Sequence, residues 1–323
     1  MIVGMNGKMK VKKMEQNERR VIVTGGAGFI GSHLVEYLVN SGEKVLVIDD
    51  LSRGTKSNLS NVLEQIEICT YSIGRDIGEI ERRIIKYEPE VIFNLAACSF
   101  VNSVDNPILA AKSNILGTLN VLESMRKCEN MPLLVHASSG SVYGESGAPC
   151  WEDASKNPTS GYGVSKLASE EYIKVWNQLY EIPFVGLRYY NVYGKRQPHY
   201  AVIPIFVKNI LEGEPILIHG DGKQTRRFTN VKDVIEATGR VSKNPDCEGE
   251  FYNIANAENT SIFYLAQLLM KLLRSRVKIR YLFERSGDIK HLNPITEKAE
   301  KDFGFSPKIS LEEGLKKMLK GRM

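Results

Sequence analysis

A glycine-rich turn near the N-terminus most constrains the fold of this chain. Residues 24–31 read Thr-Gly-Gly-Ala-Gly-Phe-Ile-Gly and join an apolar run at 21–23 to a helical pattern at 31–40. In a strand–turn–helix unit, glycines at this spacing permit the tight turn, let the backbone approach a pyrophosphate, and let the helix pack on the strand. The helix N-terminus also offers free N–H groups to phosphates. Gly25, Gly28 and Gly31 therefore predict a dinucleotide site rather than a turn without a ligand.

Short aliphatic runs alternate with longer helical patterns between residues 20 and 190. The runs lie at 21–23, 45–48, 66–69, 91–95, 133–136 and 184–187, and the helical patterns at 31–40, 78–87, 114–127 and 162–180. Apolar runs without strict alternation are typical of strands buried on both faces. The sequence therefore predicts an α/β fold with a doubly wound parallel (Rossmann) sheet.

The rhythm changes after residue 190. Helical patterns follow near 203–212, 231–241, 261–274 and 310–320, with a strand-like run at 251–254. We expect a dinucleotide-binding domain at 20–190 and a smaller α/β substrate domain at 191–323. Residues 231–255 are expected to fold back onto the first domain.

Positive charge is concentrated at the N-terminus. Residues 1–20 carry six Lys/Arg and two Glu, which leaves the remaining chain near +1 of the formal +5. We expect residues 1–19 to be a disordered basic leader or an over-long start; contact with nucleic acid or acidic lipid is the less favoured alternative. No apolar run reaches the ~18–20 residues that span a bilayer, and no signal-peptide pattern is present. The five cysteines are odd in number and lack metal-ligand spacing, so we expect reduced thiols in a cytoplasmic protein with no metal. We also expect no nucleic-acid or membrane partner.

Tyr162 and Lys166 lie four residues apart, which places both side chains on one face of a helix. A positive charge beside a phenol favours the phenolate, so the tyrosine would serve as an acid or base near neutral pH. Alone, the pair also fits an exposed helix face. Together with the glycine turn, it predicts redox chemistry on a hydroxyl group.

Asp49 and Asp50 end the second predicted strand. An acid at this position accepts hydrogen bonds from adenine-ribose hydroxyls and repels a 2′-phosphate, so NAD is favoured over NADP. The alternative is that these acids only cap a loop, and this alternative is stronger for Asp50 than for Asp49.

At this point the chain resembles the extended short-chain dehydrogenase/reductase family, in its NAD-dependent nucleotide-sugar epimerase/dehydratase branch, and is most like UDP-glucose 4-epimerases. The resemblance runs from about residue 20 to the C-terminus and rests on motifs that occur in the family's order. These lie at 24–31, 49–52, 94–97, 138–144, 162–166, 187–194, 220–226 and 285–288.

The resemblance implies roles for individual residues. Ser139, Tyr162 and Lys166 match the catalytic residues. The positions that match NAD-binding residues are Gly25, Gly28, Phe29, Ile30, Gly31, Asp49, Asp50, Ser72, Ile73, Leu95, Ala96, Ala97, Asn114, Tyr162, Lys166 and Tyr189. The positions that match nucleotide-sugar-binding residues are Asn191, Leu217, His219, Arg226, Arg285 and Asp288. Two arginines from separate segments also suit a diphosphate, because guanidinium gives forked, charged donors, although a solvated surface charge is the commoner fate of an arginine.

The chain departs from the family pattern at four places. Ser72-Ile73 replaces an aspartate–hydrophobic pair that contacts adenine, with Asp76 as a substitute candidate. Arg227 stands where an acid is common and is expected to make the diphosphate region more basic. The stretch 197–200 is shorter than usual, and Leu292 lies near a position that gates hexose size.

The expected reaction is 4-epimerisation of a nucleotide-diphosphate hexose through a 4-keto intermediate. Another enzyme of the branch, such as a different sugar epimerase, a dehydratase or a decarboxylase, stays open; a dehydratase commonly has Asp-Glu where Gly140-Ser141 stands. A simple reductase or a non-catalytic NAD-binding regulator is less favoured, since the tyrosine and lysine are both kept. Apolar positions on helices 114–127 and 162–180 favour a homodimer. The base and the sugar stay open, with uridine favoured by family frequency.

Overall fold

The computed structural model describes residues 18–146, 148–284 and 289–321. Most of the predicted leader, 1–19, and the predicted substrate residues Arg285 and Asp288 therefore lie outside the described residues.

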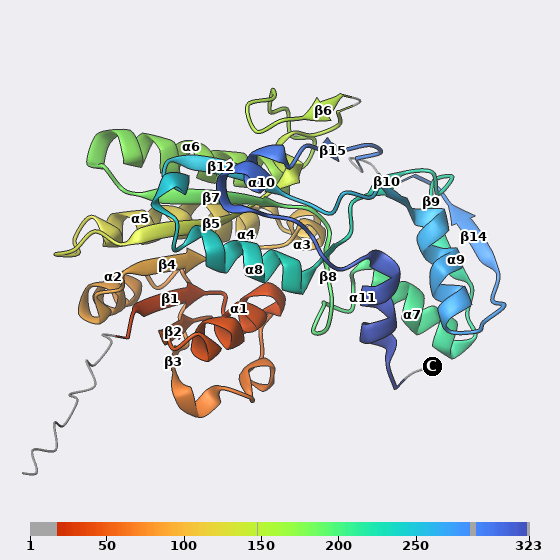
Figure 1. Cartoon of the computed structure of the whole chain (residues 1–323), viewed down its shortest axis with the longest axis horizontal. Coiled ribbons are helices and arrows are strands. Elements are labelled where there is room, and N and C mark those ends of the chain that lie inside the picture. The colour runs from red at the N-terminus through yellow and green to blue at the C-terminus, as the bar shows by residue number, and fades with distance from the viewer. Residues whose placement is uncertain (1–17, 147, 285–288, 322–323) are drawn as a thin grey trace, which may run out of the picture.

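Seven parallel strands of the described chain form one sheet in the order β12–β7–β5–β4–β1–β2–β3 (Figure 1). Their bounds are β1 Arg20–Thr24, β2 Lys44–Ile48, β3 Ile66–Cys69, β4 Val91–Asn94, β5 Leu133–Ser139, β7 Phe184–Tyr189 and β12 Glu250–Ile254. The order reverses direction at β1 and β4, and ligands bind outside the carboxyl ends of strands at such a point. The predicted doubly wound parallel sheet is confirmed.

Helices cover both faces of the sheet. One face carries α1 (Phe29–Asn40) and α8 (Val231–Val241), and the other carries α2 (Ile77–Tyr87), α5 (Gly117–Met125) and α6 (Gly161–Tyr180). Along β1, Val21 and Val23 belong to the first core, whereas Ile22 belongs to the second. Burial on both faces explains why these strands read as continuous apolar runs.

A third core lies beside the carboxyl edge of the sheet (Figure 1). It is built from α7 (Val202–Glu212), α9 (Ile262–Leu272) and α11 (Leu311–Leu319), with β9 (Ile216–His219) paired to β14 (Ile279–Leu282). Between these elements the chain returns to the sheet, since α8 packs on α1 and β12 pairs with β7. The remaining elements are η1 Lys56–Leu59, η2 Leu63–Gln65, α3 Phe100–Asp105, α4 Pro107–Ala110, η3 Ala111–Leu116, η4 Gly140–Val142, β6 Pro149–Cys150, β8 Val192–Tyr193, β10 Thr225–Arg226, β11 Thr229–Asn230, η5 Pro245–Cys247, β13 Thr260–Ser261, β15 Asn293–Pro294 and α10 Glu297–Phe303.

Where the turn after β1 meets α1, Gly25 and Gly31 have no room for a side chain. Gly25 has φ +67°, in the left-handed region that favours glycine. A Cβ on Gly31 would lie 2.1 Å from the carbonyl oxygen of Gly25. The close contact of helix and strand therefore requires glycine at position 31.

We expect Gly31→Ala to lower the free energy of unfolding by at least about 2 kcal/mol, because the new methyl group would overlap backbone that cannot move without shifting α1. Gly78→Ala in α2 is the matched control, since a Cβ there meets nothing within 4 Å. That helical substitution should be neutral or stabilise by up to about 1 kcal/mol. Urea denaturation of the two variants measures the difference, and equal midpoints would contradict this account of the turn.

Candidate active site

A cavity of about 1400 Å³ runs along the carboxyl edge of the sheet toward β9 and α9. A site for one small ligand typically encloses roughly 300–1000 Å³, so this cavity has room for two ligands. The predicted site residues that line it are Gly25, Gly28, Phe29, Ile30, Gly31, Asp49, Asp50, Ser72, Ile73, Leu95, Ala96, Ala97, Ser139, Tyr162, Lys166, Tyr189, Asn191, Leu217, His219 and Arg226.

The glycine turn and the loop after β4 form one end of the cavity. Gly28 is the N-cap of α1, so the first N–H groups of that helix face this end. The Thr24 hydroxyl accepts hydrogen bonds from the N–H groups of Leu95 and Ala96, each at 3.1 Å. A dinucleotide fits this end, because the backbone donors and the helix dipole are held in place before a phosphate arrives.

Asp49 and Asp50 have different surroundings. The Asp49 carboxylate accepts hydrogen bonds from the N–H groups of Ala27 at 2.9 Å and Leu51 at 2.8 Å. Burial raises the pKa of Asp49. Asp50 accepts a hydrogen bond from the Ser52 N–H at 3.0 Å and pairs with Arg75 at 3.2 Å. Both acids therefore stabilise loops and also line the cavity, so their contact with the adenine ribose stays a prediction.

Ser72 and Ile73 follow β3 and line the cavity next to Asp50. The carboxylate of Asp76, the substitute candidate for an adenine contact, accepts a hydrogen bond from the Ser72 N–H at 2.7 Å. Asp76 therefore shapes this loop from behind the cavity wall.

Tyr162 and Lys166 enter the cavity from the start of α6. The N-cap Ser160 accepts a hydrogen bond from the Gly163 N–H at 3.1 Å, which fixes the first turn of this helix. The Lys166 ammonium donates to the Ala137 carbonyl of β5 at 2.7 Å. On the same strand, the Ser139 hydroxyl accepts a hydrogen bond from the Ser141 N–H at 3.1 Å. The structure thus brings the three predicted catalytic residues to one wall.

The charge state of the tyrosine differs from the sequence-based expectation. Burial raises the pKa of Tyr162 to about 12, although a hydrogen bond with Ser139 opposes the rise. Burial lowers the pKa of Lys166 to about 8, although the Glu170 charge opposes the fall. In the chain alone, Tyr162 is therefore protonated at neutral pH. The expected phenolate is not formed, because burial dominates and the ammonium donates to a backbone carbonyl.

Asn114 is not brought to the cavity wall. It is 1% exposed, on a π-helical turn between α4 and α5. Its amide donates to the Ser165 hydroxyl at 2.8 Å and accepts from the Cys98 N–H at 2.7 Å. Asn114 therefore joins the loop after β4 to α6, behind Tyr162.

The other end of the cavity holds the described residues predicted to bind a nucleotide sugar. Asn191 and Arg226 lie on its wall with Leu217 and His219 of β9. His219 Nδ1 is 3.0 Å from the carbonyl oxygen of Phe283, which ties β9 to the end of β14. Arg226 Nη1 donates to the Thr225 carbonyl at 2.8 Å.

Two of the departures from the family pattern lie away from the cavity wall. Arg227 donates to the Asn256 carbonyl at 3.2 Å and to Asn259 Oδ1 at 3.3 Å. The expected gain of basic character does not reach the wall, because this guanidinium joins loops. Leu292 packs against the core cluster that contains Tyr143 and Tyr190.

Sequence analysis missed several residues that line the cavity. The ring of Phe100 meets Tyr162 edge-on at 6.5 Å between centroids. Arg53 donates to the Tyr200 hydroxyl at 3.3 Å, and both line the cavity together with Arg196. Phe100 follows β4 and Arg53 follows β2, so the rule that ligands meet strand ends could have found them.

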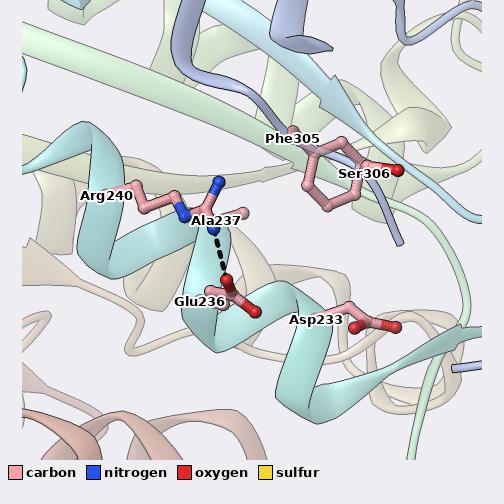
Figure 2. Close-up of a pocket in the computed structure, with 6 residues that line it drawn as sticks. All are labelled: Asp233, Glu236, Ala237, Arg240, Phe305 and Ser306. Carbon is pink, nitrogen blue, oxygen red and sulfur yellow. Dashed lines mark hydrogen bonds and ion pairs between the residues drawn. The ribbon is translucent and has the colours of Figure 1, made fainter. Parts of the chain in front are cut away.

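A second niche lies between α8 and the 305–306 segment (Figure 2). It holds about 10 Å³, room for roughly one water molecule. Its charges are already paired, since Arg240 contacts Glu236 at 2.5 Å and Asp233 accepts the Lys308 N–H at 3.2 Å. This niche is therefore too small and too well neutralised for a substrate.

Within 18–146, 148–284 and 289–321, no cluster of three or more His, Cys, Asp or Glu is placed to hold a metal ion. No helix of these ranges has the length and apolar character to cross a membrane.

Comparison with known proteins agrees with this geometry. The family model described as GDP-mannose 4,6 dehydratase matches residues 22–318. A UDP-glucose 4-epimerase of Mycolicibacterium smegmatis is 33% identical over 303 residues, 92% of this chain and 96% of the relative. A UDP-N-acetyl-alpha-D-glucosaminuronate decarboxylase of Bacillus cytotoxicus is 32% identical over 318 residues, 94% of this chain and 97% of the relative.

Solved structures give the same result. The UDP-glucose 4-epimerase of Thermotoga maritima, solved with UDP-glucose, has a TM-score of 0.87 and 35% identity, covering 93% of this chain and 97% of that chain. The Thermus thermophilus UDP-glucose 4-epimerase, solved with NAD, has a TM-score of 0.87 and 32% identity, covering 93% and 98%. The chain therefore belongs to the GDP-mannose 4,6 dehydratase family of extended short-chain dehydrogenases/reductases, whose NAD-dependent members include nucleotide-sugar epimerases and dehydratases.

Proposed function

We propose that this protein is an NAD-dependent 4-epimerase of nucleotide-diphosphate hexoses, of the UDP-glucose/UDP-galactose type. The observation that carries the proposal is one cavity lined by the glycine turn, by Tyr162 and Lys166, and by Arg226 at its far end. Residues 20–190 with 231–255 are proposed to bind NAD, and the rest of 191–323 to bind the nucleotide sugar.

The proposed chemistry uses three side chains. The glycine turn and the acids after β2 would hold NAD, which when bound would accept the hydride from C4 of the sugar and supply it back. Tyr162 takes the proton of the sugar 4-hydroxyl and later gives it back. Lys166 is charged below pH about 8 and favours the phenolate once a ligand draws its ammonium from the Ala137 carbonyl. Ser139 donates a hydrogen bond to the 4-oxygen.

Inversion requires the sugar to turn while its nucleotide stays bound. Arg226 and Asn191 are proposed to anchor the diphosphate end, with Leu217 and His219 near the base; Arg285 and Asp288 remain predicted partners outside the described residues. The 4-keto sugar then presents its other face within a cavity of about 1400 Å³. Because nothing leaves the site between the two hydride steps, the protein should keep its NAD.

A dehydratase is the first alternative within the family. Elimination of water needs a further acid and base beside the hydroxyl residue. A Cβ on Gly140 would lie 2.3 Å from the Tyr190 ring, so an acidic side chain cannot enter there without moving a buried aromatic. This contact favours epimerisation, whereas decarboxylation and other sugars remain alternatives for the experiment.

Purified protein incubated with UDP-galactose, with no added cofactor, should produce UDP-glucose. Tyr162→Phe should lower kcat by at least about 100-fold, since it removes the proton-transfer group. Chromatography of the nucleotide sugars measures conversion, and absorbance after denaturation measures bound NAD.

Tyr172→Phe, on the exposed side of the same helix, is the control and should keep wild-type activity. Bound NAD without conversion would refute the UDP-galactose substrate and direct the assay to other sugars and bases. Absence of both NAD and conversion would overturn the enzymatic proposal.

We also propose a homodimer that acts in the cytoplasm. Val104 of α3 and Ile108 of α4 are each 67% exposed, and Leu179 of α6 is 63% exposed. The three helices that carry these apolar side chains pack on one another. Exposed apolar surface of this kind marks interfaces. The helix expected at 114–127 is largely buried within α5, but Leu116 at its start is 48% exposed and adds to this apolar surface.

Val104→Lys combined with Leu179→Lys should convert the dimer to monomers, because two desolvated charges would oppose association. Tyr281→Lys, at a residue of β14 that is 54% exposed, is the control and should leave the assembly unchanged. Sedimentation velocity distinguishes the states. A wild-type monomer would refute the dimer, and a dimeric double variant would place its interface elsewhere.

A further inference from the structure

The carboxylate of Glu170 is completely buried one helical turn after Lys166. It accepts hydrogen bonds from the Ser138 hydroxyl at 2.5 Å, from Arg188 Nε at 2.9 Å and from Arg188 Nη2 at 2.8 Å. Arg188 is itself 1% exposed. A buried ion pair of this kind is costly to desolvate, and such pairs are weak evidence for stability. Because stability alone does not account for this ion pair, its position next to the candidate active site suggests a role there.

Ser138 and Arg188, the two partners of Glu170, directly precede Ser139 and Tyr189 of the cavity wall. In the pairing of β5 with β7, Ser138 lies opposite Arg188 and Ser139 lies opposite Tyr189. The Glu170 carboxylate therefore joins the ends of two strands to the helix that carries Tyr162 and Lys166. A shift in any of these elements would be transmitted to the reacting groups.

Charged neighbours control how readily Lys166 keeps its proton. The neighbour on its own helix is Glu170, whose charge opposes the effect of burial. His136 of β5 also faces Lys166, but burial and the ammonium lower the pKa of His136 well below its ordinary value, so that ring is neutral. Arg188 of β7 lies on the far side of Glu170 and offsets its charge. The other titratable groups around this pair are Tyr143, Glu152 and Lys156, with Tyr162 on the Lys166 helix.

We propose that Glu170 and Arg188 are positioning residues that set the charge of Lys166, and with it the pH range in which the reaction runs. Glu170 keeps the buried Lys166 ammonium protonated. The positive charge of Arg188 partly offsets the electrostatic effect of Glu170 on that ammonium. The proposal rests on the proposed function in one respect, namely that a charged Lys166 assists Tyr162.

The two residues should affect Lys166 in opposite directions. Glu170→Gln removes the negative charge, so Lys166 should lose its proton at a lower pH and the alkaline limb of kcat should move down by at least about one unit. Arg188→Met leaves the Glu170 charge unbalanced, so Lys166 should keep its proton to a higher pH and the limb should move up. A purely structural role would lower activity in both variants without opposite shifts.

The test measures Lys166 directly as well as through activity. The side-chain resonance of Lys166 in protein labelled with ¹³C at lysine Cε, assigned with Lys166→Met, gives its titration in each variant. Glu171→Gln, which removes an exposed partner of Lys174 on the same helix, is the matched control and should leave the titration unchanged. If Glu170→Gln does not fold, Arg188→Met alone decides, and a Lys166 titration that does not move to higher pH in that variant overturns the proposal.

Opposite shifts of the Lys166 titration support the proposal. Identical titration in wild type and Glu170→Gln overturns it, whatever the enzyme does. If the titration shifts as expected but no nucleotide sugar is epimerised, the electrostatic role stands and the proposed substrate falls.

Discussion

The register of two parallel strands determines which side chains reach the cavity. At the ends of β5 and β7, Ser138 and Arg188 contact Glu170 of α6 on one face of the sheet. One residue further, the Tyr189 hydroxyl lies 2.7 Å from the Thr238 hydroxyl of α8, on the other face. Because side chains alternate along a strand, a slip of one residue would exchange these surroundings. The buried ion pair and the catalytic wall therefore depend on the same pairing.

The sequence predicts the sheet well because its signals are local. The aliphatic runs correspond to β1–β5, β7 and β12, and the glycine spacing corresponds to a turn in which helix and strand touch. The β9–β14 pair was not predicted, because its strands are separated by α8, β12 and α9, and pairing between distant segments leaves no local pattern. The helix predicted at 114–127 starts earlier, at Pro107, because α4 runs directly into the π-helical turn that buries Asn114.

The site shows a similar division between position and environment. Spacing and strand ends predicted which side chains meet, and all the described candidates except Asn114 line the cavity. Their charge states could not be predicted in this way. The spacing of Tyr162 and Lys166 implies a shared helix face, but the Lys166 ammonium donates to a carbonyl of β5 and burial raises the pKa of the phenol. The groups that bury these side chains and bond to them come from segments far apart in the sequence, so a local pattern does not predict the charge states.

This division bears on how one fold carries out several reactions. The groups needed to start any of them, a dinucleotide turn and a tyrosine–lysine pair, are fixed by the sheet and by α6. Beside Ser139 in this chain, the Tyr190 ring occupies the space that a side chain on Gly140 would need. Tyr190 is held there by a hydrogen bond of 3.0 Å to Asn253 of β12. The edge strand β12 thus limits which side chains fit at the end of β5, and this limit supports the proposed epimerisation over elimination of water.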